Sequence, residues 1–245
     1  MTCICVLGMH RSGTSCLTGI MQNIGVELGQ VHTKNAANKR GNRENSAVVS
    51  LNEKLLKING ATWYQPVVIS HWGWRHKFAR KKIISILRSH PSEFWGFKDT
   101  RTLFTLDFWL EGIIKAGEEV RFIGTFRHPL QVARSLNRRD GAPIEQCLKL
   151  WQIYNTRLIE LARAKDFDLV DFDLPDEEYL NDAITKLTKL GLNPEKAVKA
   201  GEFFDPRLRN TIDSDDQNEV LPADIRALYA ELKDHHNEHA SPADQ

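Results

Sequence analysis

The chain has 245 residues, of which 41% are hydrophobic and 27% are charged, and its formal net charge is +1. These values are ordinary for a globular protein with a large core, and the near-neutral charge argues against a general nucleic-acid binder. No apolar run is long enough to span a bilayer, and the opening "MTCICVLGM" lacks the basic residues of a signal peptide. We therefore predict a cytoplasmic protein that inserts into no membrane and binds no nucleic acid.

Strand-like apolar runs alternate with segments whose apolar residues recur at helical spacing. In chain order we expect a strand at 3–7, helices at 15–28, 44–58 and 74–90, a strand at 93–98, a helix at 104–117, a strand at 119–127, helices at 129–138 and 144–165, a strand at 168–172 and a helix at 176–191. This alternation predicts an α/β fold in which a parallel central sheet is flanked by helices on both faces.

The whole chain, 1–245, is predicted to form a single domain, because no repeat or low-complexity segment divides it. From about residue 203 the composition becomes polar, and "DPRLRNTIDSDDQNE" predicts a loop. The following "LPADIRALYAELKDHH" predicts one last helix, so a polar segment and a final helix occupy about 203–240.

Four cysteines, Cys3, Cys5, Cys16 and Cys147, have no spacing typical of a disulfide or zinc framework. Cys3 and Cys5 alternate inside a strand, so both thiols are predicted to point to one face of the sheet. We interpret these residues as small buried side chains in a reducing compartment.

Residues 8–15, "GMHRSGTS", lie between the first strand and the first helix and have the spacing of a phosphate-binding loop. Gly8 and Gly13 match the Walker pattern, but Thr14 stands where that pattern has its lysine. Backbone N–H groups at a helix N-terminus favour an anion, and Arg11 adds a permanent charge. The hydroxyl donors available here are Ser12, Thr14 and Ser15.

This loop, taken together with the later "FRHPLQVARS", resembles the sulfotransferases that use 3′-phosphoadenylyl sulfate (PAPS). The stretches "RGNRENSAVVSLNEKLL" and "FKDTRTLF" also resemble segments of bacterial members. In that family a turn of the type [KR]-S-G-T-[ST] holds the 5′-phosphosulfate. An Arg at a strand end and a Ser eight residues later hold the 3′-phosphate. The resemblance covers roughly residues 3–175 and implies a P-loop NTPase-like sulfotransferase fold. It implies cofactor-binding roles for Arg11, Ser12, Gly13, Thr14, Ser15, Arg127 and Ser135.

The implied reaction moves the sulfuryl group in line from PAPS to a hydroxyl or amine and leaves the product PAP. Arg11 occupies the catalytic Lys/Arg position of the family and is expected to neutralise charge on the leaving phosphate oxygen. A sulfonate carries one negative charge, so backbone amides plus one cation are expected to suffice without a metal. The acceptor, a small molecule or a carbohydrate, and the oligomeric state cannot be read from the sequence.

Three residues are candidates for the base that takes the proton of the acceptor. Glu44 resembles the acidic residue that relatives place over the sulfonate, although a glutamate also suits a helix N-terminus. His32 lies in the polar loop before it and titrates near neutrality. Asp99 follows a predicted strand, where ligand-facing residues gather in α/β sheets.

Other polar residues beside these candidates have less defined roles. Lys98 resembles a lysine that contacts the leaving oxygen or the sulfonate in some relatives. The alternative is that Lys98, Asp99 and Arg101 form an ion-pair cluster. His10 and Arg101 are placed to line the site, but neither occupies a motif position.

One family feature is absent, because the chain lacks the C-terminal R-K-G-x-x-G-D-W segment of many cytosolic relatives. The segment 203–211, "FFDPRLRNT", is the candidate replacement, in which Arg209 or Arg207 would reach the 3′-phosphate. Two alternatives stay open: a P-loop kinase or NTPase that uses Mg-nucleotide, and a sulfotransferase-like protein that binds PAP or another anion without catalysis.

Overall fold

The computed structural model describes residues 1–31, 33, 41–69, 73, 76–193, 195, 203–205 and 221–239. Its strands are β1 (Thr2–Gly8), β2 (Phe94–Lys98), β3 (Glu119–Phe126) and β4 (Leu169–Asp171). Its helices are α1 (Thr14–Asn23), α2 (Ser46–Ile58), α3 (Lys77–Arg88), α4 (Thr102–Lys115), α5 (Pro129–Asp140), α6 (Ile144–Lys165), α7 (Asp176–Lys189) and α9 (Ala223–Glu238).

The four strands form one sheet in the order β2-β1-β3-β4, and every neighbouring pair is parallel. The register aligns Val6 with Lys98 and Gly8 with Thr125, so the carboxyl ends of β1, β2 and β3 meet at one edge. Ligands of open α/β sheets bind outside this edge. The predicted α/β fold with a parallel central sheet is confirmed.

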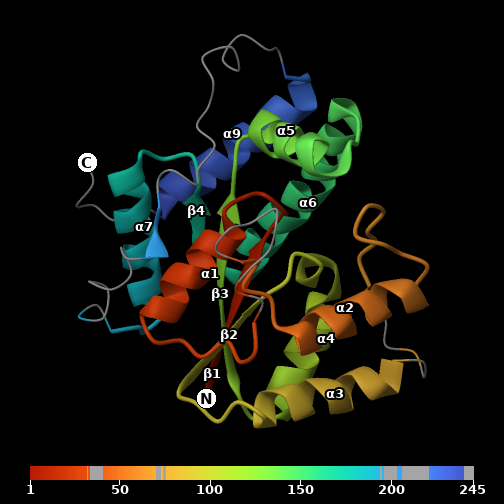
Figure 1. Ribbon diagram of the computed structural model, residues 1–245, viewed down its shortest axis with the longest axis vertical. Coiled ribbons are helices and arrows are strands. Elements are labelled where there is room, and N and C mark those ends of the chain that lie inside the picture. The colour runs from red at the N-terminus through yellow and green to blue at the C-terminus, as the bar shows by residue number, and fades with distance from the viewer. Residues whose placement is uncertain are drawn as a thin grey trace.

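Side chains of β1 alternate between two hydrophobic cores. Cys3, Cys5 and Leu7 belong to one cluster, which β1 shares with α2, α3, α4, α5 and α6. Ile4 and Val6 belong to the other, which is closed by α1 and α7. Figure 1 shows α1 and α7 on the left of the sheet and α2, α3 and α4 on the right. The prediction that Cys3 and Cys5 share one sheet face is confirmed.

The first helix is shorter than its apolar pattern predicts. It ends at Asn23 rather than continuing to residue 28, because Gly25 has a φ of 113° and turns the chain. The residues that follow run beside β2, where Glu27 forms a parallel bridge with Trp95. Val26 and Leu28 are still buried, so an apolar spacing that suits a helix is also satisfied by this extended segment.

Asn45 begins α2 by capping its first turn. Its side-chain oxygen accepts a hydrogen bond from Ala47 N at 3.0 Å, and its amide donates to Leu28 O at 3.1 Å. Replacing Asn45 with Ala is expected to lower the free energy of unfolding by about 1 kcal/mol. Chemical denaturation measures this, with the exposed Ser50→Ala as the control. Equal stability of the two variants would contradict the capping role.

The last described helix, α9, packs on α6 and β4 (Figure 1). It occupies the place of the final helix expected from the sequence, whereas the polar segment 206–220 before it lies outside the described residues. Among the described helices, none is both long enough and apolar enough to cross a membrane.

Candidate functional site

The loop between β1 and α1 requires glycine at two positions. A Cβ on Gly8 would lie 2.5 Å from the backbone oxygen of Thr125, because β3 passes closely beside it. Gly13 has a φ of 81°, and a Cβ there would lie 2.2 Å from the ring of Phe172. The spacing of the two glycines therefore reflects close packing of the loop against the ends of β3 and β4.

Ser12 has the only hydroxyl in this loop that is buried without a partner among the described residues. Its backbone oxygen is held by the hydroxyl of Thr125 at 2.9 Å, and its side chain is fully buried. A buried hydroxyl of this kind normally has a hydrogen-bond partner, so it suits an anion bound in the loop. The donor set of the loop thus fits a phosphate or a sulfonate.

The other two predicted hydroxyl residues lie at the start of α1. Thr14 is its first residue and is buried, with its methyl group beside Gly8. Ser15 donates its hydroxyl proton to Asn42 O at 3.1 Å, which links the loop to the segment before α2.

Arg11 connects this loop to α5. Its Nε donates to the hydroxyl oxygen of Ser135 at 2.7 Å, across 124 positions of sequence. Arg11 has a φ of 67°, so its backbone is in the left-handed region that non-glycine residues rarely adopt. The structure therefore brings together the two separate elements that the sequence singled out, the loop and the Arg127/Ser135 pattern.

Further cations surround Arg11. Burial lowers the pKa of Arg11, and the nearby Arg139, Arg127 and Arg138 lower it further. An arginine still keeps its charge at neutral pH. Mutually repelling cations at the mouth of a loop are stabilised by a bound anion.

Arg127 directly follows β3 and is held by Asp173, a residue that sequence reasoning missed. Arg127 Nε lies 3.2 Å from Asp173 Oδ1, and His128 N donates to the other oxygen at 2.5 Å. The indole N–H of Trp151 donates to Arg127 O at 2.9 Å, which fixes the backbone of this turn. Asp173 could have been predicted as a site residue, because it follows directly after the predicted strand 168–172.

Lys98 and Glu44 form an ion pair at the end of β2. Their Nζ and Oε1 atoms are 2.8 Å apart, and the side chains are 4% and 14% exposed. A buried pair of this kind holds Glu44 in place over the edge of the sheet and offsets the charge of Lys98. The two residues were predicted separately, and the structure places them together.

Asp99 lies in a buried polar network instead of facing the edge. One of its oxygens accepts from Arg101, through both the backbone N–H and the guanidinium, and the other accepts from Asn52. Burial raises the pKa of Asp99, whereas Arg101 opposes that shift. The ion-pair alternative thus describes Asp99 and Arg101, but Lys98 pairs with Glu44 instead.

Two predicted site residues, His32 and Arg209, lie outside the described residues. Arg207, the alternative to Arg209, also lies outside them. In the part of the chain that the structure describes, no group of three or more His, Cys, Asp or Glu residues is placed to hold a metal ion.

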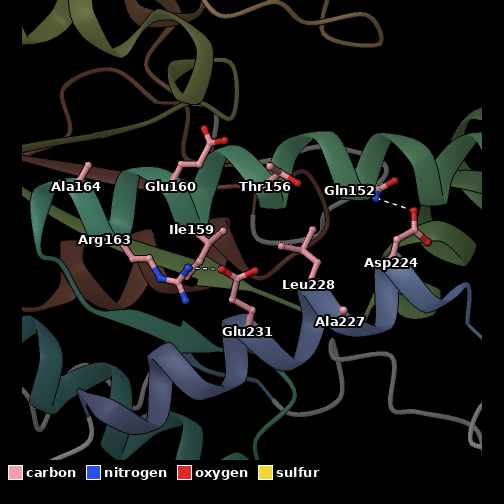
Figure 2. Close-up of a pocket in the computed structure, with 10 residues that line it drawn as sticks. All are labelled: Gln152, Thr156, Ile159, Glu160, Arg163, Ala164, Asp224, Ala227, Leu228 and Glu231. Atoms are coloured by element: carbon pink, nitrogen blue, oxygen red, sulfur yellow. Dashed lines mark hydrogen bonds and ion pairs between the residues drawn. The ribbon is translucent and has the colours of Figure 1, made fainter.

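An open groove between α6 and α9 is separate from this edge (Figure 2). Gln152 of α6 donates to Asp224 of α9 at 2.9 Å, and a second pair of side chains bridges the groove further along. A different side of α9 turns toward the strand ends, where Tyr229 packs edge-on against His128 at 5.1 Å. We therefore place no part of the candidate site in the groove.

Comparison with solved structures identifies the class of fold. The chain is similar to the sulfotransferase domain from the Synechococcus PCC 7002 olefin synthase, with a TM-score of 0.55 and 17% sequence identity. The match covers 95% of this chain and 94% of that chain. No protein-family model and no curated protein matches the sequence. The four-stranded parallel sheet with its flanking helices is thus a sulfotransferase fold, as the resemblance of the loop implied.

Proposed function

We propose that this protein is a sulfotransferase that moves the sulfuryl group of PAPS to a hydroxyl or amine of an acceptor and releases PAP. The observation that carries the proposal is the hydrogen bond from Arg11 Nε to Ser135 Oγ. This hydrogen bond links the loop, which is suited to bind one anion, to the Arg127/Ser135 pattern, which is suited to bind a second anion. PAPS carries two such groups, the 5′-phosphosulfate and the 3′-phosphate.

The residues of the loop have distinct tasks in this proposal. The loop N–H groups and the Ser12 hydroxyl bind the 5′-phosphosulfate, and Arg11 neutralises charge on the phosphate oxygen from which sulfur departs. Arg127 and Ser135 bind the 3′-phosphate. Because the Ser135 oxygen accepts from Arg11, its own O–H is left to donate to a phosphate oxygen.

In this proposal the Lys98–Glu44 pair, at the end of β2, contacts the sulfuryl group during its transfer. Lys98 Nζ has three protons, of which one is donated to Glu44, so it has donors for a sulfonate oxygen. The bond from sulfur to the acceptor oxygen forms as the bond from sulfur to the 5′-phosphate breaks. The proton of the acceptor must leave in the same reaction.

A second candidate function, a protein that binds PAP without catalysis, is favoured by one observation. The two described carboxylates that the sequence offered as bases are both engaged, Glu44 with Lys98 and Asp99 with Arg101. Each of these carboxylates thus already has a cation as its partner. A P-loop kinase or NTPase has less support, because Thr14 stands where such a loop has its lysine.

Calorimetry with PAP, ADP and ATP, each in EDTA and in Mg²⁺, separates these candidates. We expect PAP to bind without Mg²⁺ and about 100-fold more tightly than ADP, since the 3′-phosphate adds charged hydrogen bonds. ATP binding that requires Mg²⁺ would overturn the proposal. Release of PAP from PAPS then distinguishes the enzyme from the non-catalytic binder.

Ser135→Ala tests the role given to the second element. Loss of one hydrogen bond to a charged group is expected to weaken PAP about tenfold and to leave ADP unchanged within about twofold. Ser85→Ala, at an exposed serine of α3, is the control. An equal loss for PAP and ADP would show that Ser135 does not contact the 3′-phosphate.

A further inference from the structure

His10 lies in the loop directly before Arg11, and the roles given above do not use its side chain. Its Nε2 is 2.7 Å from the hydroxyl oxygen of Thr100, at the end of β2. Its ring packs on Trp63 with centroids 4.8 Å apart, and edge-on to Tyr154 at 6.1 Å. The imidazole is therefore fixed between the loop, the end of β2 and α6.

The groups around Thr100 indicate which nitrogen of His10 carries its proton. Tyr154 donates its hydroxyl proton to Trp63 O at 2.9 Å, and a carbonyl oxygen can only accept. Thr100 opposes the rise that burial causes in the pKa of Tyr154, which is the effect of a hydroxyl that donates toward the Tyr154 oxygen. The one proton of Tyr154 is already used, so we assign Thr100 as the donor. The Thr100 oxygen must then accept from His10 Nε2–H. This leaves a lone pair on Nδ1, which hydrogen bonds to none of the described residues.

The surroundings of His10 favour its neutral form. Burial lowers the pKa of His10 well below its ordinary value, and the cations Arg139, Lys98 and Arg101 lower it further. Asp140 of α5 opposes this shift, but Asp140 itself pairs with Arg139 at 2.7 Å. At neutral pH the lone pair on Nδ1 is thus available, unlike the oxygens of Asp99.

We propose that His10 is the base of the transfer reaction and that Thr100 and Tyr154 are positioning residues that fix its tautomer. The proposal rests on the proposed sulfotransferase function. As the acceptor oxygen bonds to sulfur and the bond from sulfur to the 5′-phosphate breaks, the acceptor proton moves to His10 Nδ1. PAP leaves with the electron pair of the broken bond, and His10 returns its proton to water.

The tautomer is tested without any acceptor. In the full chain labelled with ¹⁵N-histidine, NMR of the imidazole nitrogens is expected to show a protonated Nε2 and an unprotonated Nδ1 for His10, assigned by its loss in His10→Gln. Thr100→Val is expected to give a mixture of the two tautomers. A protonated Nδ1 in the wild-type protein would overturn the proposal whatever the activity.

The base role is tested by hydrolysis of PAPS, with water as the acceptor. His10→Gln keeps an amide that can donate to Thr100 but has no basic nitrogen, and we expect about 10²-fold slower hydrolysis. Because protonation of Nδ1 removes the base, the wild-type rate falls as the pH drops through the lowered pKa of His10, and this fall disappears in His10→Gln. The matched control is His239→Gln, at the end of α9, which keeps the wild-type rate and profile.

Binding of PAP to each variant separates the two proposals. If PAP binds to wild type and to His10→Gln with equal affinity, but both hydrolyse PAPS at the same rate with the same pH profile, His10 is not the base. The proposed function then stands. If PAP does not bind to the wild-type protein, the proposed function fails and the base role fails with it.

Discussion

Replacing Arg11 with Gly is expected to slow the release of PAP from PAPS by about 10³-fold, while the affinity for PAP falls by less than about tenfold. The reason is that charge builds on the leaving phosphate oxygen only as the bond to sulfur breaks, so most of the contribution of Arg11 is made in the transition state. Glycine suits the φ of 67° at this position, so the backbone of the loop is kept. Steady-state kinetics and calorimetry measure the two effects separately.

Two further variants define what Arg11 contributes. Arg11→Lys keeps the charge without the planar fork, and a loss of about tenfold in rate is expected. Arg138→Ala removes an exposed cation of α5 that lies near Arg11, and the rate is expected to stay within about threefold of wild type. Arg11→Gly with a near-normal rate would show that the guanidinium has no role in the chemistry.

The second large effect is expected at Gly13. Gly13→Ala places a Cβ 2.2 Å from the ring of Phe172 at a φ of 81°. The left-handed backbone costs about 1 kcal/mol for an L-residue, and overpacking against a buried ring adds about 1–3 kcal/mol. We expect the free energy of unfolding to fall by about 3 kcal/mol. PAP binding is also expected to be lost, because Gly13 is the residue directly before α1 and its shift displaces the N–H groups at the start of that helix.

Gly117→Ala separates backbone strain from packing. Gly117 has a φ of 76°, close to that of Gly13, but a Cβ there meets nothing within 4 Å. Only the cost of the left-handed backbone applies here, so we expect the free energy of unfolding to fall by about 1 kcal/mol. PAP binding is expected to stay unchanged. Denaturation curves of the two variants measure the difference, and equal losses would contradict the packing of Phe172 on the loop.

Much of the fold follows from local sequence patterns. The apolar runs that become β1 and β3 lie at the centre of the sheet and are buried on both faces, so their hydrophobic signal is strong. The loop is also predictable, because its two glycines are set by the close approach of β3 and β4. The end of α1 was predicted wrongly, since the buried residues after Gly25 continue the helical spacing in an extended segment.

The contacts within the site could not be derived in the same way. Arg11 and Ser135 are 124 positions apart, and Glu44 and Lys98 are 54 apart. A family pattern can name these residues, but only the packing of β2 and α5 beside β1 determines which side chains pair. Asp99 is an example of a side chain whose direction the sequence does not specify. A carboxylate after a strand can face the ligand edge or the core, and here Asn52 and Arg101 hold it inside.

A crystal structure of the protein with PAP tests the proposed function most directly. We expect the 5′-phosphate to lie within hydrogen-bond distance of the loop N–H groups and of the Ser12 hydroxyl. The 3′-phosphate is expected to contact Arg127 and Ser135, and His10 to face the side from which an acceptor would approach. PAP bound away from the loop, or with its 3′-phosphate remote from both Arg127 and Ser135, would contradict the proposed function.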